Sequence, residues 1–316
     1  MKDTILFGDC KDTLKTIDSK VQMCVTSPPY YGLRDYGGEE NQIGQENTPE
    51  EYINNLVEVF REVRNILSDD GVLWVNIGDS YYNYRPGKGQ GLVKQSVSKT
   101  NQDLPTKCNR RANKLEGLKE KDLIGIPWML AFALRSDGWY LRQDIIWHKP
   151  NPMPESVKDR CTKSHEYIFL LSKNKKYYYD NEAIKEPVKQ DWGTRDRTKC
   201  KYHNSGTGLS PHSGLSKSYD RKNKRSVWSV TNKPYKDAHF AVYPPDLIEP
   251  CILAGSQEGD IILDPFMGSG TTGMVAKKLG RHYIGCELHE SYAELIDKRV
   301  PVDKPVHNAL TMALNM

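Results

Sequence analysis

Cysteine, long apolar runs and an export signal are scarce or missing in this 316-residue sequence. Its 7 cysteines are scattered and form no Cys-x-x-Cys pair, which argues against a disulfide scaffold and fits a reducing cytosol. The longest apolar run, residues 126–134, falls far short of the roughly 20 residues that cross a bilayer. The N-terminal residues show no apolar stretch before a small-residue cleavage site. We therefore expect a cytoplasmic protein that is neither secreted nor embedded in a membrane.

Positive charge gathers in two segments, although the whole chain carries a net charge of only +4. Residues 173–236 hold 16 Lys and Arg against 6 Asp and Glu, and residues 85–121 hold 10 against 3. Both segments are rich in Gly, Ser, Thr and Asn, which predicts irregular or mobile backbone. Two solvated loops are the simpler interpretation. Attraction to a polyanion, with nucleic acid as the first candidate, is the more specific one.

Strand and helix patterns alternate at both ends of the chain. Thr48 can cap a helix, Pro49 suits its first position, and Glu51 completes a capping box. Apolar residues continue that helix at helical spacing until Asp70-Gly71, which we expect to end it. Other helices are predicted at residues 124–136, 245–254, 271–279 and 291–299, and strands at 4–7, 21–25, 72–77, 139–147, 166–171, 261–263 and 282–286. The alternation predicts an α/β fold, in which helices cover both faces of a largely parallel sheet.

A glycine-rich loop follows the strand predicted at 261–263. Its sequence, Asp264-Pro265-Phe266-Met267-Gly268-Ser269-Gly270-Thr271-Thr272-Gly273, contains G-x-G-x-x-G and leads into a helix. Such glycines let the backbone turn tightly against a ligand, although many matches to this pattern are plain turns. No Lys follows the last glycine, so the loop is not a phosphate-binding P-loop. Glu287, at the end of the next predicted strand, can accept both hydroxyl hydrogens of a ribose, and the two features together predict a nucleoside-containing cofactor.

A second motif, Thr26-Ser27-Pro28-Pro29-Tyr30, follows the strand predicted at 21–25. A rigid turn that bears an exposed aromatic ring is one interpretation. The alternative is geometric, because Ser27 Oγ and the Pro28 carbonyl can both accept hydrogen bonds from one exocyclic NH2 group. Those bonds draw the nitrogen lone pair out of conjugation with a base ring. Tyr30 then offers a flat face on which an extruded base can stack.

TSPPY and DPFMGSGTTG together closely resemble the amino-methylating DNA methyltransferases that use S-adenosylmethionine. Residues 6–10, 72–79 and 239–247 resemble further motifs of that family. The catalytic motif comes first, the long basic insert second and the cofactor loop last, as in the permuted class called β. The resemblance implies a Rossmann-like class I methyltransferase fold with an inserted target-recognition region. It divides the chain into a catalytic part (1–172, with a mobile basic loop at about 83–121), a recognition insert (173–236), a cofactor-binding part (237–300) and a tail (301–316).

The resemblance also assigns roles to single residues. Ser27 polarises the amino group, and the Pro28 carbonyl assists it. Pro29 belongs to the same catalytic motif, and the base stacks on the ring of Tyr30. The remaining assignments concern the cofactor: Asp9 and Cys10 near the adenine, Glu287 at the ribose, Asp264 and Phe266 in the motif that walls the pocket, Gly268, Ser269, Gly270, Thr271 and Thr272 at the methionine end, and His239 and Phe240 near its carboxyl group.

The implied reaction is direct transfer of the sulfonium methyl to an exocyclic nitrogen of a flipped base, without a covalent enzyme intermediate. Within the family, serine at the position of Ser27 is typical of N4-cytosine methylation, whereas N6-adenine enzymes usually carry Asp or Asn there. Methylation of adenine, methylation of RNA and a non-catalytic DNA-binding role stay open. A nicotinamide dehydrogenase would leave Ser27 and the basic segments without a role. The implied partner is duplex DNA in a bacterial or phage-infected cell, and a homodimer and a cognate restriction endonuclease are compatible with the family.

Two cysteine patterns have simpler structural interpretations. Pro250-Cys251 is similar to the nucleophile of cytosine-C5 methyltransferases, but it falls inside a predicted helix, where a buried small residue is the better interpretation. Cys200, His203 and His212 lack a second pair of ligands, so we expect no metal site.

Residues 147–152 fit a Pro-rich turn as well as a DNA-contacting loop.

Overall fold

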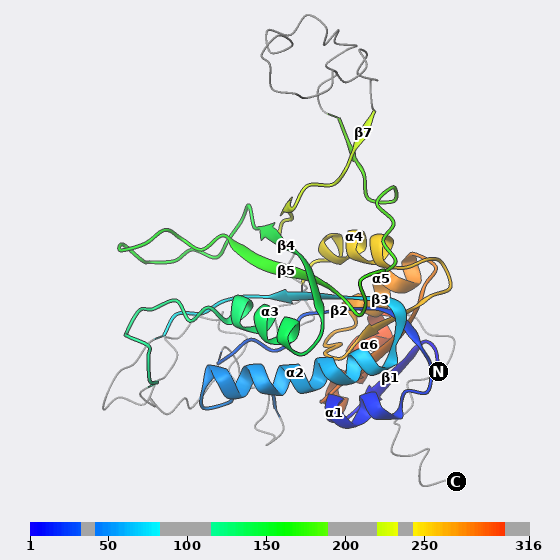
Figure 1. The fold of residues 1–316 in the computed structure, drawn as a ribbon, viewed down its shortest axis with the longest axis horizontal. Helices are drawn as coiled ribbons and strands as arrows, with labels where there is room; N and C mark the ends of the chain where they lie inside the picture. The colour runs from blue at the N-terminus through cyan, green and yellow to red at the C-terminus, as the bar shows by residue number, and fades with distance from the viewer. Residues whose placement is uncertain (33–41, 83–114, 189–219, 233–242, 301–316) are drawn as a thin grey trace, which may run out of the picture.

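The computed structural model describes residues 1–32, 42–82, 115–188, 220–232 and 243–300. Their centre is an eight-stranded mixed sheet with the strand order β1-β10-β9-β2-β3-β5-β4-β8 (Figure 1). The first five strands in this order run parallel, whereas β5 is antiparallel to both of its neighbours. The α/β prediction is confirmed in its coarse form, a mostly parallel sheet with flanking helices.

The predicted elements recur with small shifts at their ends. The strands are β1 (Thr4–Phe7), β2 (Val21–Thr26), β3 (Leu67–Ile77), β4 (Tyr140–His148), β5 (His165–Ser172), β6 (Glu186–Pro187), β7 (Arg221–Lys222), β8 (Val227–Ser229), β9 (Ile261–Asp264) and β10 (His282–Glu287). The helices are α1 (Cys10–Thr13), α2 (Pro49–Ile66), α3 (Ile126–Ser136), α4 (Pro245–Gly255), α5 (Thr271–Lys278) and α6 (Ala293–Arg299), with short 3-10 turns at Leu14–Thr16 and Glu290–Tyr292. No helix in the described ranges is long and apolar enough to cross a membrane.

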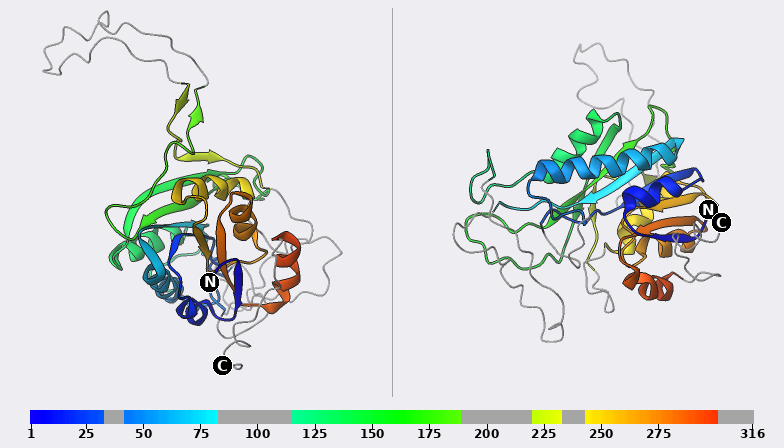
Figure 2. Two further views of the ribbon diagram at one scale, coloured as in Figure 1. Left: turned by 90° about the vertical axis from the view of Figure 1, so that its right-hand side faces the viewer. Right: turned by 90° about the horizontal axis from the view of Figure 1, so that it is seen from below.

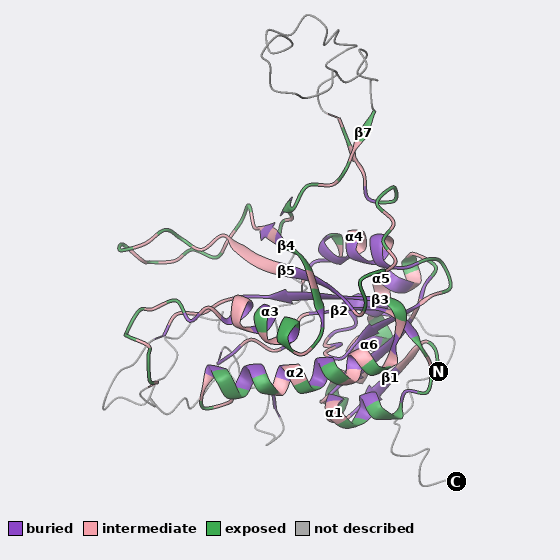
Figure 3. Cartoon of the chain, in the orientation of Figure 1, coloured by how far each residue is buried: buried purple, intermediate pink, exposed green. Residues whose placement is uncertain are grey.

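Alternate residues of the central strands contribute to two separate cores. On β3, Leu73 and Val75 belong to one core, and Val72 and Trp74 belong to the other, as the two-residue period of a strand requires. Helices α1, α2 and α3 pack on the first face, and α4, α5 and α6 pack on the second (Figures 1 and 2). Because both faces are covered, β2 and β3 are buried over most of their length (Figure 3).

Helix α2 begins where the sequence predicts. The Thr48 side chain accepts a 3.1 Å hydrogen bond from the Glu51 backbone, and the Glu51 carboxylate accepts one from the Thr48 backbone. The helix ends at Ile66, however, so the prediction that Asp70-Gly71 ends it is wrong.

Asp70-Gly71 instead marks a bulge inside β3. The register of β3 against β2 shifts between Val21, which pairs with Leu67, and Met23, which pairs with Val72. A Cβ at position 71 would lie 2.9 Å from the Ser68 carbonyl oxygen. Glycine is therefore needed at position 71, where the unpaired residues of the bulge bring the backbone close to Ser68.

Part of the predicted recognition insert is built into the main sheet. Strand β8 pairs in parallel with β4 at the sheet edge, with Trp147 opposite Trp228. In the part of the chain that the structure describes, strands β6 and β7 pair only with each other and form a separate ribbon in the upper part of Figure 1. The segment 173–236 is thus anchored beside β4, while its ribbon stands away from the main sheet.

Candidate active site

The carboxyl ends of the five parallel strands meet at one edge of the sheet. Strand β2 connects through α2 to β3 on one side, whereas its neighbour β9 connects through α5 to β10 on the other. The strand order therefore reverses between β2 and β9, and ligands of open α/β sheets bind at such a point. Residues 27–30 follow β2 and residues 265–270 follow β9. The structure thus brings the two predicted motifs together.

Asp264 connects these two motifs through hydrogen bonds. Its buried carboxylate accepts hydrogen bonds from Thr26 Oγ1 at 2.6 Å, Thr272 Oγ1 at 2.5 Å, Tyr243 Oη at 3.0 Å and the Phe266 backbone at 3.0 Å. Burial raises the pKa of Asp264, and these hydrogen bonds oppose that shift. The carboxylate links the end of β2 to the glycine loop and to Tyr243, a residue that the sequence analysis placed only inside a longer motif.

The glycine loop has the backbone geometry that its sequence suggests. Gly268 and Gly270 have φ angles of 53° and 81°, a left-handed region that favours glycine. A Cβ on Gly270 would also lie 2.9 Å from a methyl group of Val300, whereas one on Gly268 would meet only an oxygen at 3.9 Å. Among the described residues, the Cα of Gly268 therefore faces open space. Beside it, Thr271 Oγ1 is buried and has no hydrogen-bond partner among the described residues.

Glu287 holds the same loop from the neighbouring strand. Its Oε2 accepts a 2.8 Å hydrogen bond from the Gly268 backbone, and its Oε1 accepts one of 3.1 Å from the His289 backbone. The side chain is almost completely buried, and burial raises its pKa to about 7. This carboxyl group therefore changes charge near neutral pH.

Asp9 and Cys10 follow β1 at the same edge of the sheet. The Asp9 side chain accepts a 2.8 Å hydrogen bond from the Lys11 backbone and so caps α1. Cys10 packs into the core, and burial raises the pKa of its thiol. The chain just before Asp9 runs beside the end of β10, because the Gly8 backbone donates a 2.9 Å hydrogen bond to the Glu287 carbonyl oxygen.

The turn at residues 27–30 is fixed by contacts on both sides. Tyr52 of α2 donates a 2.8 Å hydrogen bond to the Pro29 carbonyl oxygen. The Tyr30 ring lies so close to Gly78 that a Cβ at position 78 would be 2.7 Å from its Cε2 atom. Ser27 Oγ lies 3.5 Å from Tyr30 Oη. Tyr30 is half-buried, and its packing against Gly78 and its hydrogen bond to Glu166 hold the ring in place.

Glu166 and two residues that the sequence placed only inside longer segments, Asn76 and Lys149, form the polar surroundings of Tyr30. Tyr30 Oη donates a 2.7 Å hydrogen bond to Glu166 Oε2, and Asn76 Nδ2 donates to the same oxygen at 3.3 Å. Lys149 forms an ion pair with the other carboxylate oxygen. Burial and the Glu166 charge raise the pKa of Tyr30 well above its usual range. Glu166 is the one acid of β5, and its place beside the apolar run of that strand was a signal that could have identified it.

A hairpin of residues 149–164 extends from this edge of the sheet, between β4 and β5 (Figure 1). The Arg160 guanidinium lies 3.9 Å from the centre of the Tyr81 ring. Asn151 exchanges two hydrogen bonds, of 3.2 and 3.0 Å, with the backbone of Asn232. The hairpin is therefore tied to chain segments on both of its sides.

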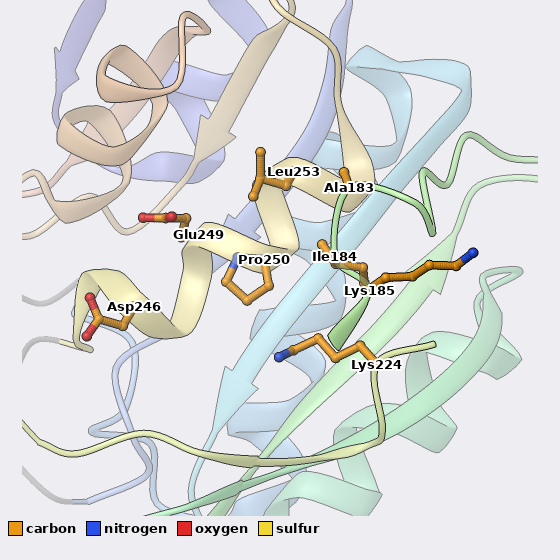
Figure 4. Close-up of a pocket in the computed structure, with 8 residues that line it drawn as sticks. All are labelled: Ala183, Ile184, Lys185, Lys224, Asp246, Glu249, Pro250 and Leu253. Carbon is orange, nitrogen blue, oxygen red and sulfur yellow. The ribbon is translucent and has the colours of Figure 1, made fainter. Parts of the chain in front are cut away.

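A separate cavity of about 290 Å³ lies beside α4 (Figure 4). Two lysines, Lys185 and Lys224, and two acids, Asp246 and Glu249, line it together with Ala183, Ile184, Pro250 and Leu253. Among the described residues, none of those predicted to bind cofactor or base lines this cavity. Cys251, on the same helix, is fully buried in the core.

Some predicted residues lie outside the described part of the chain. They are His239 and Phe240, assigned to the cofactor, and Cys200, His203 and His212, for which we expected no metal site. Most of the basic loop at 83–121, much of the recognition insert and the tail at 301–316 lie there as well.

Comparison with known proteins identifies the family. A profile of the N6/N4 methyltransferases, described as DNA methylase, matches residues 21–298. The chain belongs to this DNA methylase family. The methylase is 48% identical over 302 residues to the type II methyltransferase M.SmaI of Serratia marcescens, and the match covers 94% of this chain and 90% of that protein. It is 46% identical over 299 residues to M.Cfr9I of Citrobacter freundii, with a coverage of 94% and 87%.

Solved structures share the fold of the methylase. The PvuII DNA methyltransferase, described as cytosine-N4-specific, superposes with a TM-score of 0.62 at 17% identity, and the match covers 100% of this chain and 92% of that one. The putative DNA modification methylase TTHA0409 of Thermus thermophilus, solved in complex with S-adenosyl-L-methionine, superposes with a TM-score of 0.58 at 22% identity and a coverage of 96% and 97%. The resemblance to amino-DNA methyltransferases inferred from the two motifs is confirmed.

Proposed function

We propose that this methylase transfers a methyl group from S-adenosylmethionine to the exocyclic N4 amino group of cytosine in duplex DNA. The observation that carries the proposal is the link through Asp264, which holds the Ser27 turn and the glycine loop across the strand switch point. The DNA methylase family and its type II relatives support DNA as the substrate. Serine at position 27 and the cytosine-N4-specific PvuII relative in fold support cytosine as the base.

The glycine loop fits a nucleoside cofactor. Among the described residues, Gly268 faces open space and Thr271 Oγ1 is buried without a partner, and the Glu287 carboxylate lies within hydrogen-bond distance of the loop. Glu287 binds the ribose hydroxyls, Asp9 and Cys10 lie near the adenine, and the loop with Thr271 holds the methionine end. When bound, S-adenosylmethionine supplies a methyl group made electrophilic by its sulfonium.

Ser27 and Pro28 orient the nitrogen that receives this methyl group. The Ser27 hydroxyl oxygen and the Pro28 carbonyl oxygen accept hydrogen bonds from the amino hydrogens of the base. The nitrogen lone pair then leaves conjugation with the ring and points along the line of transfer, and this alignment supplies much of the catalysis. The base reaches the site by leaving the duplex, which costs roughly a few kcal/mol of unstacking.

The order of the motifs supports a permuted class I arrangement. The catalytic part, residues 1–172, precedes the recognition insert at 173–236, and the cofactor-binding part at 237–300 follows it. The basic composition of the insert supports contacts with DNA phosphates, which help to offset the cost of extruding the base. The type II designation of the relatives supports a role beside a cognate restriction endonuclease in a bacterial cell.

Nucleoside analysis tests the reaction directly. Unmethylated DNA of mixed sequence is incubated with the protein and S-adenosylmethionine, digested to nucleosides and analysed by mass spectrometry. The expected product is N4-methylcytosine. N6-methyladenine would overturn the choice of base and keep the reaction class. RNA is incubated in parallel, and a methylated base found only in the RNA sample would overturn the choice of DNA.

A further inference from the structure

Three oxygen atoms form a row that leads from the Ser27 turn to β5. Ser27 Oγ lies 3.5 Å from Tyr30 Oη, and Tyr30 Oη lies 2.7 Å from Glu166 Oε2. The row ends at Lys149, whose ammonium group pairs with Glu166 Oε1. Both members of this ion pair are largely shielded from water, with side chains 16% and 15% exposed.

The carboxylate fixes the direction of hydrogen bonding along this row. A carboxylate paired with an ammonium group can only accept hydrogen bonds. Tyr30 has a single hydroxyl hydrogen, and Glu166 Oε2 at 2.7 Å attracts it more strongly than the neutral Asn76 Oδ1 at 3.3 Å. The lone pairs of Tyr30 Oη are then left to accept the hydroxyl hydrogen of Ser27.

This direction matters for the chemistry of the amino group. A Ser27 hydroxyl that donates toward Tyr30 turns its own lone pairs toward the base, where it can accept an amino hydrogen. A Ser27 hydroxyl that donated to the amino nitrogen would occupy the lone pair that must attack the methyl group. The distant carboxylate thereby decides whether Ser27 activates the nitrogen or blocks it.

We propose that Glu166, held in place by Lys149, is a positioning residue that sets the hydrogen-bond direction through Tyr30 to Ser27. The inference rests on the proposed methyl transfer to an exocyclic amino group and adds a residue that acts through two others. A purely structural ion pair would contribute to stability and leave the rate of the chemical step unchanged.

Two variants interrupt the row at different points. In Glu166→Gln the amide can donate to Tyr30 Oη and reverse the direction of the row. In Tyr30→Phe the ring stays available for stacking and the Lys149–Glu166 pair stays intact. This variant therefore tests the loss of the hydroxyl without the loss of stability that breaking the ion pair could cause. Glu155→Gln is the matched control, because Glu155 also forms an ion pair, with Arg160 at 2.6 Å, without contacting Tyr30.

The experiment measures single-turnover methyl transfer at saturating enzyme and S-adenosylmethionine, on a duplex whose methylated base has first been located with the unchanged protein. Cofactor affinity by calorimetry and base extrusion by 2-aminopurine fluorescence are measured on the same variants. Glu166→Gln and Tyr30→Phe should lower the single-turnover rate roughly 10- to 100-fold, with cofactor affinity and extrusion close to those of the unchanged protein. Glu155→Gln should keep the unchanged rate.

Wild-type transfer rates in both row variants would overturn the inference and leave the proposed function standing. A loss of rate matched by equal losses in cofactor affinity and extrusion would also overturn it, because the row would then be structural only. Absence of methyl transfer in the unchanged protein would instead overturn the proposed function.

Discussion

Thr26 Oγ1 donates a 2.6 Å hydrogen bond to Asp264 Oδ1, although the two residues lie 238 positions apart in the chain. Thr26 is the last residue of β2 and Asp264 the last residue of β9. The Ser27 turn begins one residue after the first, and the glycine loop begins one residue after the second. A displacement of either loop therefore acts on the same buried carboxylate.

Asp264→Asn should destabilise the fold and disturb both loops. The four donors around this side chain need acceptors on both oxygens, and an amide replaces one oxygen by an NH2 group that faces other donors. Leaving buried groups unsatisfied costs about 1–3 kcal/mol, so the free energy of unfolding in urea should fall by about that amount. Asp297→Asn, an exposed substitution on α6, should leave it unchanged. Equal stabilities would contradict the bracing role of Asp264.

Ser27→Ala should remove methyl transfer while preserving the site. The alanine has no oxygen that can accept an amino hydrogen, but the Tyr52 bond to Pro29 still holds the turn. We expect the single-turnover rate to fall by about 100-fold or more, with S-adenosylmethionine affinity within a few-fold by calorimetry. Ser19→Ala, in a loop between α1 and β2, serves as the control. A fully active Ser27→Ala variant would refute the assigned role.

Cofactor affinity should increase with pH around neutrality. Burial raises the pKa of Glu287 to about 7, and only the ionised carboxylate can accept both ribose hydroxyls. Below this pKa the cofactor must displace a proton, so affinity falls as the pH falls; above it the proton is already lost and affinity levels off. Calorimetry at pH about 6 and about 8 measures the change, and proton release on binding should appear near pH 7.

Glu287→Gln separates this carboxyl from other titrating groups. The amide does not ionise in this range, so the variant should bind S-adenosylmethionine more weakly than the unchanged protein above the pKa of Glu287 and show little pH dependence. A variant that keeps the pH dependence of the unchanged protein would assign the titration to another group.

The strands and the two motifs are predictable because their signals are local. The capping box of Thr48 and Glu51 and the glycines of the cofactor loop each act within a few residues, and the structure places them as expected. The Asp70-Gly71 pair was misread because a helix end and a strand bulge use the same residues. The strand pairing that decides between them involves Val21 and Met23, far away in the sequence.

The surroundings of Tyr30 could not be predicted for a similar reason. Glu166 lies 136 residues from Tyr30, and Lys149 reaches it only because β4 and β5 pair as a hairpin. An acid in an apolar strand signals a buried partner, but its identity depends on the strand order β2-β3-β5-β4. Composition does not reveal that order.

Gly78→Ala should slow methyl transfer by displacing the Tyr30 ring. The added Cβ would lie 2.7 Å from Tyr30 Cε2, closer than packed carbon atoms approach, so the ring or the backbone must move. A shifted ring changes the stacking face and lengthens the bonds from Tyr30 Oη to Ser27 and Glu166. We expect a lower single-turnover rate with nearly unchanged cofactor affinity, since the glycine loop is built by other strands.

Ser80→Ala, two residues away, is the matched control for Gly78→Ala. The Ser80 hydroxyl is buried and has no hydrogen-bond partner among the described residues, so removing it creates no new unsatisfied group. Thermal unfolding of both variants, measured beside the methyl-transfer rate, separates a displaced ring from a weakened fold. A Gly78→Ala variant as active as Ser80→Ala would show that the position of the Tyr30 ring does not limit the reaction.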